Sequence, residues 1–462
     1  MMRSLFAGVS GLQNHQIRMD VIGNNISNIN TIGFKKGRVN FQDLLSQNMQ
    51  GAARPGADLG GVNPKQIGLG MNVATIDTIH LQGSLQTTGV VSDVAIQGNG
   101  YFVLEGGDKL FFSRAGAFGI DEGGSLVNPA NGMRVQGWMA QNIDGQQFIN
   151  SAADVESLII PIGSKDPAAA TSQVFLSSNL DKRTPEVLPG ATASATHAGT
   201  WTIDKDIFDG LGNVHTMRIN FTKLVGINNQ WQAEVTVDPD AETSTNTLVD
   251  IGGVNNATNT FTMAFDNFGA LLQAVDDAGD VVDIGQLQVQ VAFDVQDSTV
   301  GLAGALLRQG FDLSLGEVGS MVNSLTQFAE SSSTKAYRQN GYAMGYLENY
   351  QIDQSGAITG VYSNGTNRLI GKLALASFTN PGGLEKAGES TFVVTNNSGE
   401  ANVGESGIAG KGKIVSGALE MSNVDLAEQF TDMIVTQRGF QANSRTIQTS
   451  DAMLQEILTL KR

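Results

Sequence analysis

Few residues of this chain have the types and spacing that active-site chemistry requires. The four histidines, His15, His80, His197 and His215, lie far apart and show none of the spacings that bind a metal ion. Gly410-Lys411-Gly412-Lys413 lacks the spacing of a phosphate-binding loop, and no nucleophile elbow or marked carboxylate pair occurs. The sequence therefore predicts a protein without catalytic residues, metal or cofactor, and not an enzyme.

The composition narrows the class of protein further. The chain has 462 residues, enough for several domains, and a net charge of −17, which argues against nucleic-acid binding. A high glycine content (56 residues) with 6% aromatics suits many short strands joined by turns. Because there is no cysteine, disulfides and thiolate metal sites are excluded.

Neither a signal peptide nor a membrane span is expected. The first residues lack the unbroken apolar core of a secretory signal, and no run of 18 apolar residues occurs. If the protein leaves the cytoplasm, it must use a route that does not read such a signal.

The N-terminal segment has the pattern of a helix with a narrow apolar seam. Apolar residues recur with coiled-coil spacing, and Gln16 and Gly23 fill the gaps. The seam consists of Leu5, Val9, Leu12, Met19 and Ile26.

The C-terminal segment shows the same pattern over a longer stretch. Ser422 and Asp425 form an S-x-x-D helix start. A strict 4-3 alternation follows at Leu426, Phe430, Met433, Gln437, Phe440, Ser444, Ile447, Asp451, Leu454 and Leu458. So narrow a seam needs a partner, and the N-terminal seam is the natural candidate.

Between the two ends the sequence has the pattern of β-sheet. Alternating runs at Val94 to Leu104, Trp231 to Val237 and Thr260 to Phe265 predict strands. If the ends pair, the middle is inserted between them, and each domain combines an early and a late segment. The predicted fold is α+β and multidomain, with paired terminal helices and nested, discontinuous, mainly β domains.

The expected boundaries follow this nesting. We expect a helical domain, an extended connector, a β-rich middle domain and a β-rich outer domain. Their respective residues are 1–30 with 422–462, 31–70 with 411–421, 71–168 with 324–410, and 169–323.

Both ends carry motifs that resemble those of the flagellar rod and hook family. The N-terminal motif contains Asn24, Asn25, Asn28, Thr31, Gly33, Phe34 and Lys35. The C-terminal motif contains Asn423, Asp425, Gln437, Arg438 and Asn443. Segments in the middle, including Tyr362 to Gly365 and Asp206 to Thr222, look like the hook members of the family.

The resemblance implies a structural subunit that assembles into the curved, flexible joint between flagellar rod and filament. Implied partners are further copies of the chain, rod and hook–filament junction proteins, a hook cap and the flagellar type III export apparatus. Export would take place without a cleaved signal peptide, and into the periplasm if the source is a spirochete. Alternatives are a distal rod subunit and, from a different class, a secreted β-rich hydrolase or adhesin.

The asparagines of the N-terminal motif have two interpretations. Their side chains could bond main-chain groups where the helix ends and so hold the connector. Alternatively, asparagine is merely tolerated at a helix terminus. We favour the first interpretation.

A closer likeness to spirochete hook proteins implies a covalent cross-link. In those proteins a cysteine loses its sulfur to give dehydroalanine, and a lysine of a neighbouring subunit adds to form lysinoalanine. The matching residues here are Lys165, Asn179 and Thr334, while Ser178 occupies the cysteine position. Hydroxide leaves far less readily than a thiol sulfur, whose pKa is about 8.5. The likeness therefore predicts that this chain polymerises without cross-linking, unless these are ordinary boundary residues.

Overall fold

The computed structural model describes residues 2–52, 54, 60–61, 63–107, 109–143, 146–188, 192–238, 259–276, 286–294 and 308–460. The chain forms two compact units. The first unit contains both ends of the chain, and the second is inserted between them, as the nested arrangement predicts. Their residues are Met1–Ile162, Glu348–Val361 and Asn367–Arg462 for the first unit, and Gly163–Leu347 with Tyr362–Thr366 for the second.

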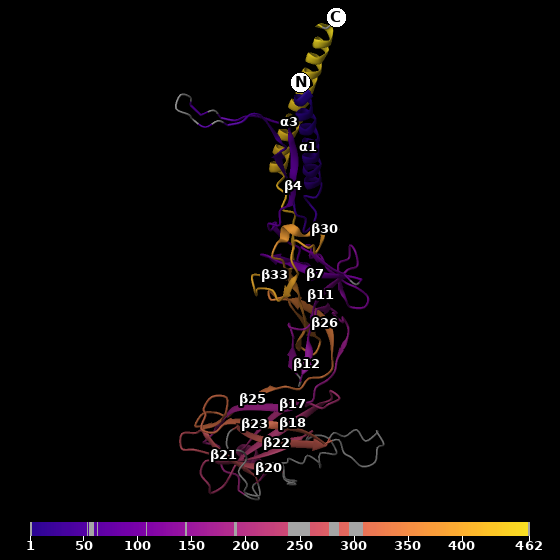
Figure 1. Ribbon diagram of the computed structural model, residues 1–462. Coiled ribbons are helices and arrows are strands. Elements are labelled where there is room, and N and C mark those ends of the chain that lie inside the picture. Colours follow the sequence, from indigo (N-terminus) through magenta and orange to yellow (C-terminus); the bar gives the residue numbers. More distant parts are fainter. Residues whose placement is uncertain are drawn as a thin grey trace. The chain divides into compact units, whose positions relative to one another are not determined.

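Two long helices of the first unit run side by side (Figure 1). They are α1 (Met2–Ser27) and α3 (Leu426–Leu460), and neither contains proline. The helical pattern expected at each end is confirmed.

A β-hairpin follows α1, where the sequence predicts an extended connector without periodicity. Strand β1 (Gly37–Asp43) pairs antiparallel with β4 (Met71–Thr78), and β2 (Ser46–Gln50) pairs with β3 (Lys65–Gly68). Two further short pairs join early and late segments. They are β5 (Leu85–Thr87) with β34 (Ala418–Glu420), and β6 (Val94–Gln97) with β33 (Lys413–Ser416).

The rest of the first unit is an antiparallel sheet around an aromatic core. Its path is β27 (Ala357–Tyr362), β28 (Asn367–Leu373), β11 (Arg134–Met139), β7 (Tyr101–Gly106), β8 (Lys109–Ser113), β31 (Thr391–Val393) and β30 (Glu385–Gly388). Shorter strands flank it: β9 (Gly119–Ile120), β10 (Leu126–Val127), β14 (Glu156–Ser157), β29 (Leu375–Ser377) and β32 (Asn402–Gly404). Strands β12 (Gln141–Ile143) and β13 (Gln146–Phe148) form a separate two-stranded antiparallel ribbon. A 3-10 helical turn, η2, spans Pro381–Gly383.

The run from Val94 to Leu104 is two strands rather than one. β6 and β7 pair with different neighbours, because Gly98 and Gly100 adopt positive φ angles of 109° and 135° between them.

The second unit contains two five-stranded sheets that share one apolar core. One sheet comprises β16 (Gln173–Asp181), β22 (Gln286–Asp294), β23 (Arg308–Glu317), β24 (Leu325–Phe328) and β25 (Ser333–Gln339). The other comprises β17 (Thr200–Phe208), β18 (Val214–Lys223), β19 (Gln230–Val237), β20 (Thr260–Phe265) and β21 (Leu271–Asp276). Burial alternates along β19 and β20, which confirms the predicted strands.

The second unit extends beyond the outer domain expected at 169–323. β24 and β25 lie after residue 323 and yet both pair with β16. Two further elements complete the unit: the short helix α2 (Ala193–Gly199), and β15 (Lys165–Asp166), which pairs with the start of β26 (Gly345–Ile352).

Candidate functional site

The terminal helices form an antiparallel pair. Ser4 Oγ lies 3.2 Å from Ser450 Oγ, and Asn25 donates a 2.9 Å hydrogen bond to Gln429. α3 continues past Ser450 to Leu460, beyond the start of α1.

Small residues allow the two helices to approach closely. A Cβ atom at Gly11 would lie 2.5 Å from Asn443 Nδ2, and one at Gly439 would lie 2.8 Å from the His15 ring. Ile447 packs against Gly8. Any larger side chain at Gly11 would therefore displace the Asn443 side chain from its place between the helices.

The predicted pairing of the two apolar seams is wrong. The contact residues keep the predicted 4-3 spacing but are displaced by one residue, which is about 100° around a helix. They are Ser4, Gly8, Gly11, His15, Arg18, Ile22 and Asn25 on α1, and Gln429, Asp432, Thr436, Gly439, Asn443 and Ser450 on α3. Ile447 is the exception, because it belongs to the predicted seam and also contacts Gly8. Polar hydrogen bonds and glycine contacts hold the pair together.

Much of the apolar surface of both helices is left open as a result. On α1, Leu5, Leu12, Met19 and Ile26 are only half-buried, and Val9 is 42% exposed. On α3, Met433 and Leu454 are half-buried. The exposed apolar stripe consists of Phe6, Val9 and Ile17 on α1 and Leu426, Phe430, Ile434, Val435, Phe440, Met453, Ile457 and Leu458 on α3.

Asp425 caps the start of α3. Its carboxylate accepts hydrogen bonds from the main-chain N–H groups of Ala427 and Glu428 at 2.8 and 3.2 Å. Ser422 is not the cap, because its hydroxyl accepts only from Val424, before the helix begins. Gln437 and Arg438 of the family motif are exposed on α3.

The asparagines of the N-terminal motif hold the connector. The side-chain amide of Asn25 contacts both main-chain polar groups of Gly37. It donates to the Gly37 carbonyl oxygen at 2.8 Å and accepts from the Gly37 N–H at 2.9 Å. Asn28 donates to the main-chain and side-chain oxygens of Asn24, and Thr31 donates to Asn28. This geometry supports the first interpretation of these side chains.

Below the helices a buried carboxylate joins segments far apart in the sequence. Glu420 Oε1 accepts from Lys35 Nζ at 2.6 Å, and Oε2 accepts from Arg114 at 3.2 Å. The side chains of Lys35 and Glu420 are fully buried. Burial lowers the pKa of Lys35, and the Glu420 carboxylate opposes this effect. We call these three residues the ionic hub.

Main-chain contacts reinforce the ionic hub. The Gly33 N–H donates to the main-chain carbonyl oxygen of Glu420, and the Gly83 N–H donates to the side-chain carboxylate of Glu420. Gly33 has a φ of +70°, and a Cβ atom there would lie 2.5 Å from the Ala115 nitrogen, so only glycine fits. Asn423 accepts from Lys36 N–H and donates to the oxygens of residues 79 and 81.

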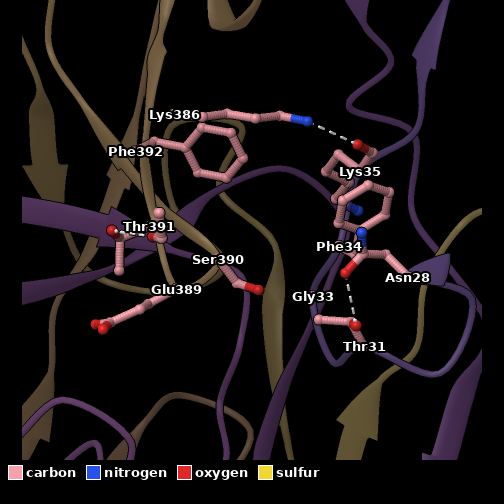
Figure 2. A pocket seen from close by; sticks show the side chains of 11 residues that line it. Asn28, Thr31, Gly33, Phe34, Lys35, Lys386, Glu389, Ser390, Thr391 and Phe392 are labelled. Carbon is pink, nitrogen blue, oxygen red and sulfur yellow. Dashed lines mark hydrogen bonds between the residues drawn. The ribbon is translucent and has the colours of Figure 1, made fainter. Parts of the chain in front are cut away.

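A pocket of about 240 Å³ opens beside the ionic hub. Figure 2 shows the rings of Phe34 and Phe392 on its walls, with Lys386 reaching over to the Lys35 oxygen at 3.1 Å. Its remaining lining residues include Asn28 and Thr31 of the family motif.

His80 is half-buried close to the ionic hub. Its Nδ1 shares a 2.8 Å hydrogen bond with Tyr101 Oη, and its ring packs against Phe392. Burial, followed by the charges of Lys35, Lys386 and Arg114, lowers the pKa of His80 to about 4.

We expect the neutral His80 to make the fold sensitive to acid. Because its folded pKa is depressed from 6.5 to about 4, its contribution is complete above pH 6.5 and is lost as the pH falls toward 4. After allowance for solvent screening, the loss is about 2 kcal/mol. Urea unfolding from pH 7 to pH 4 should show this loss relative to His80→Phe, and parallel pH profiles would contradict the assignment.

The other three histidines lie apart from His80. His15 contacts Gly439, His215 pairs with Asp238 at 2.6 Å, and His197 lies on α2. Within the described residues, no three metal-ligating side chains come together.

Three of the residues that the likeness assigns to a cross-link come together in the second unit. Ser178 and Asn179 lie on β16, and Thr334 is opposite Ser178 on β25. Ser178 is on the core-facing side with Leu176 and Leu180, and its hydroxyl has no hydrogen-bond partner in the described part of the chain. Lys165 is exposed on β15, where it is paired with Tyr346.

Family models match the chain at both ends and in the middle. The matches are "Flagella basal body rod protein" at 5–35, "Flagellar hook protein FlgE/F/G D1 domain" at 95–165, "Flagellar basal body protein FlaE D2 domain" at 179–342 and "Flagellar basal body rod FlgEFG protein C-terminal" at 415–460. The paired helices, the ionic hub and the nested sheets thus belong to a flagellar axial protein.

Full-length relatives identify the branch of that class. The chain is 59% identical to the flagellar hook protein FlgE of Treponema pallidum and 55% identical to that of Borreliella burgdorferi, each over 100% of both chains. The crystal structure of Helicobacter pylori FlgE2 has the same fold, with a TM-score of 0.50 at 15% identity over 73% of this chain and 100% of that chain.

The chain belongs to the flagellar hook protein FlgE family and is a structural subunit of the flagellar hook. The full-length similarity to hook proteins favours a hook subunit over the distal rod subunit and the secreted hydrolase or adhesin. Membership implies self-polymerisation as part of the flagellum. No described helix is long and apolar enough to cross a membrane.

Proposed function

We propose that the chain polymerises by burying the exposed apolar stripe of α1 and α3 against the helices of neighbouring copies. The observation that carries this proposal is the exposure of large side chains on a helix pair joined through small and polar residues; Leu458 is 70% exposed and Phe430 47%. Large exposed apolar side chains gathered on one pair of helices are typical of an interaction site. The helices of a lone chain would gain most of their stability on assembly.

Membership of the hook family supports a proposal for the export route and for the other proteins that the chain contacts. The chain is exported unfolded and uncleaved by the flagellar type III apparatus, adds beneath a hook cap, and contacts rod and hook–filament junction proteins at the two ends of the hook. Because its relatives include spirochete proteins, we place the assembled hook in the periplasm. The polymer acts as the flexible joint that transmits torque.

Removal of residues 426–462 tests the assembly proposal. The truncated chain should keep the folded second unit, because that unit receives no strand from the removed segment. It should form no tubes in electron micrographs. Normal tubes from the truncated chain would refute the proposal.

Point substitutions sharpen this test. Phe430→Asp places a charge on the stripe and should block tube formation while α3 stays helical. Gln448→Asp is the matched control, because Gln448 is also exposed on α3 and none of its neighbours three or four residues away belongs to the stripe. Equal assembly of the two variants would show that the stripe is not the assembly surface.

We further propose that this chain forms no lysinoalanine. In the relatives' chemistry, the cysteine at the position of Ser178 loses its α-proton and its sulfur, which leaves a carbon–carbon double bond. The N–H of a lysine then adds across that double bond. The serine at position 178 supports a block at the first step, since hydroxide is a poor leaving group. Assembled hooks boiled in SDS should therefore run as monomer, and a covalent ladder would exclude the proposal.

A further inference from the structure

The pocket beside the ionic hub lies between two segments of the first unit that are far apart in the sequence. One wall comes from residues 28–35, which follow α1, and the other from β30, β31 and the turn between them. Its volume of about 240 Å³ is large enough for a small organic molecule. Because both segments line the pocket, an occupant would fasten one segment to the other.

The pocket combines apolar walls with a cation at one end. The rings of Phe34 and Phe392 form its walls (Figure 2). Lys386 Nζ lies 4.9 Å from the centre of the Phe34 ring and donates to the Lys35 oxygen at 3.1 Å. Although Lys386 as a whole is exposed, burial lowers the pKa of its amine. Within the described residues this amine has no carboxylate partner, so an anionic ligand would supply the missing counter-charge.

The surroundings of Lys386 add to the positive charge. In the adjacent ionic hub, Lys35 and Arg114 carry two cations against the single carboxylate of Glu420. Glu389 also lines the pocket, but its carboxylate points away from the Lys386 amine (Figure 2). The amine end of the pocket therefore has a net positive charge and favours an anion.

The turn between β30 and β31 has an uncommon backbone. Glu389 and Ser390 have φ angles of 50° and 57°, in the left-handed region where hairpin turns prefer asparagine and glycine. Ser113 Oγ donates to the Ser390 oxygen at 2.9 Å, and Thr391 Oγ1 donates to the Gly388 oxygen at 2.7 Å, so the turn is held in place. Strained backbone of this kind clusters at ligand-binding sites. The turn is a second observation, independent of charge, that points to a ligand.

We propose that this pocket binds a small organic carboxylate. The carboxylate accepts a hydrogen bond from Lys386 Nζ, and the apolar body of the ligand lies between the rings of Phe34 and Phe392. Bound in this way, the ligand fastens the segment after α1 to the β30–β31 hairpin. The inference goes beyond assembly, because it needs no contact between copies of the chain.

Fluorine NMR with para-fluorobenzoate tests the site, because the ring and the carboxylate of this probe match the two parts of the pocket. The probe is titrated into the full-length chain, both unassembled and as tubes, and the broadening of its signal is measured. We expect saturable binding to both samples. The uncharged para-fluorobenzamide has the same ring and should bind on the order of tenfold to a hundredfold more weakly.

Substitutions in the full-length chain locate the site. Lys386→Met should weaken the binding of para-fluorobenzoate by about tenfold to a hundredfold, whereas Lys386→Arg keeps the charge and should keep the binding. Lys109→Met is the matched control and should bind normally, because Lys109 is exposed on β8 of the same unit and lies outside the pocket. Glu389→Gln removes the carboxylate that lines the pocket and should strengthen binding.

Equal binding of para-fluorobenzamide, undiminished binding by Lys386→Met, or the absence of saturable binding would overturn the proposal. Loss of binding on assembly would assign the pocket to an acidic side chain of a neighbouring copy and would likewise exclude a free ligand. If Lys386→Met does not fold, Glu389→Gln provides the second measurement, and weaker binding by that variant would contradict the assignment.

Discussion

Replacing Glu420 by Gln should destabilise the first unit by about 3–5 kcal/mol. The substitution leaves Lys35 and Arg114 in the interior without a counter-charge, since their side chains are 0% and 4% exposed. Without the carboxylate that opposes desolvation, the pKa of Lys35 falls further. Because the ionic hub joins the segment after α1 to the segment before α3, assembly should fail together with stability.

The measurement is urea unfolding, with amide hydrogen exchange of β5 and β34 to locate the loss. Glu428→Gln is the matched control, because Glu428 forms a 2.7 Å pair with Lys36 but is 53% exposed. That variant should lose no more than about 1 kcal/mol. Equal losses in the two variants would show that burial of the ionic hub is unimportant.

Ser178→Cys should have two large effects on the second unit. A thiol is satisfied on the apolar face where the serine hydroxyl has no partner, so thermal unfolding should show about 1–3 kcal/mol of added stability. In assembled hooks the cysteine should also restore lysinoalanine. A ladder that resists reducing agent should appear, with loss of one hydrogen sulfide for each bond.

Two variants isolate these effects. Ser177→Cys introduces a thiol one residue away on the other face of β16, and should give neither added stability nor a ladder. Lys165→Arg in the Ser178→Cys chain keeps the positive charge but removes the amine, and should abolish the ladder alone. A ladder that persists in this double variant would exclude Lys165 as the donor.

The helices show where sequence reasoning succeeded and where it failed. Heptad spacing at residues 5–26 and 426–458 predicted two long helices that need partners, and both helices exist. The predicted contact face of each helix differs from the observed one by one residue. The reason is that apolar periodicity does not distinguish a seam buried within one chain from an apolar stripe that a neighbouring chain covers. Gly11 and Asn443 carried the missing signal, since small residues permit close helix approach.

The ionic hub could not be predicted from the sequence, and the setting of position 178 was missed. Lys35, Arg114 and Glu420 are separated by long stretches of sequence, and no local pattern marks them as partners. The alternation along β16 could have shown that Ser178 shares the face of Leu176 and Leu180, but the strand itself was not predicted.

The sequence by itself determined that this protein lacks recognisable catalytic spacing, folds as nested β-rich segments between terminal helices, and carries the end motifs of a flagellar axial protein. Those properties depend on residue types and on separations of a few positions, which local geometry translates directly into structure. Only the tertiary structure decided which helix faces meet, which charges are buried together, and where the apolar surfaces remain open. These depend on contacts between residues hundreds of positions apart, and burial of the whole chain selects them.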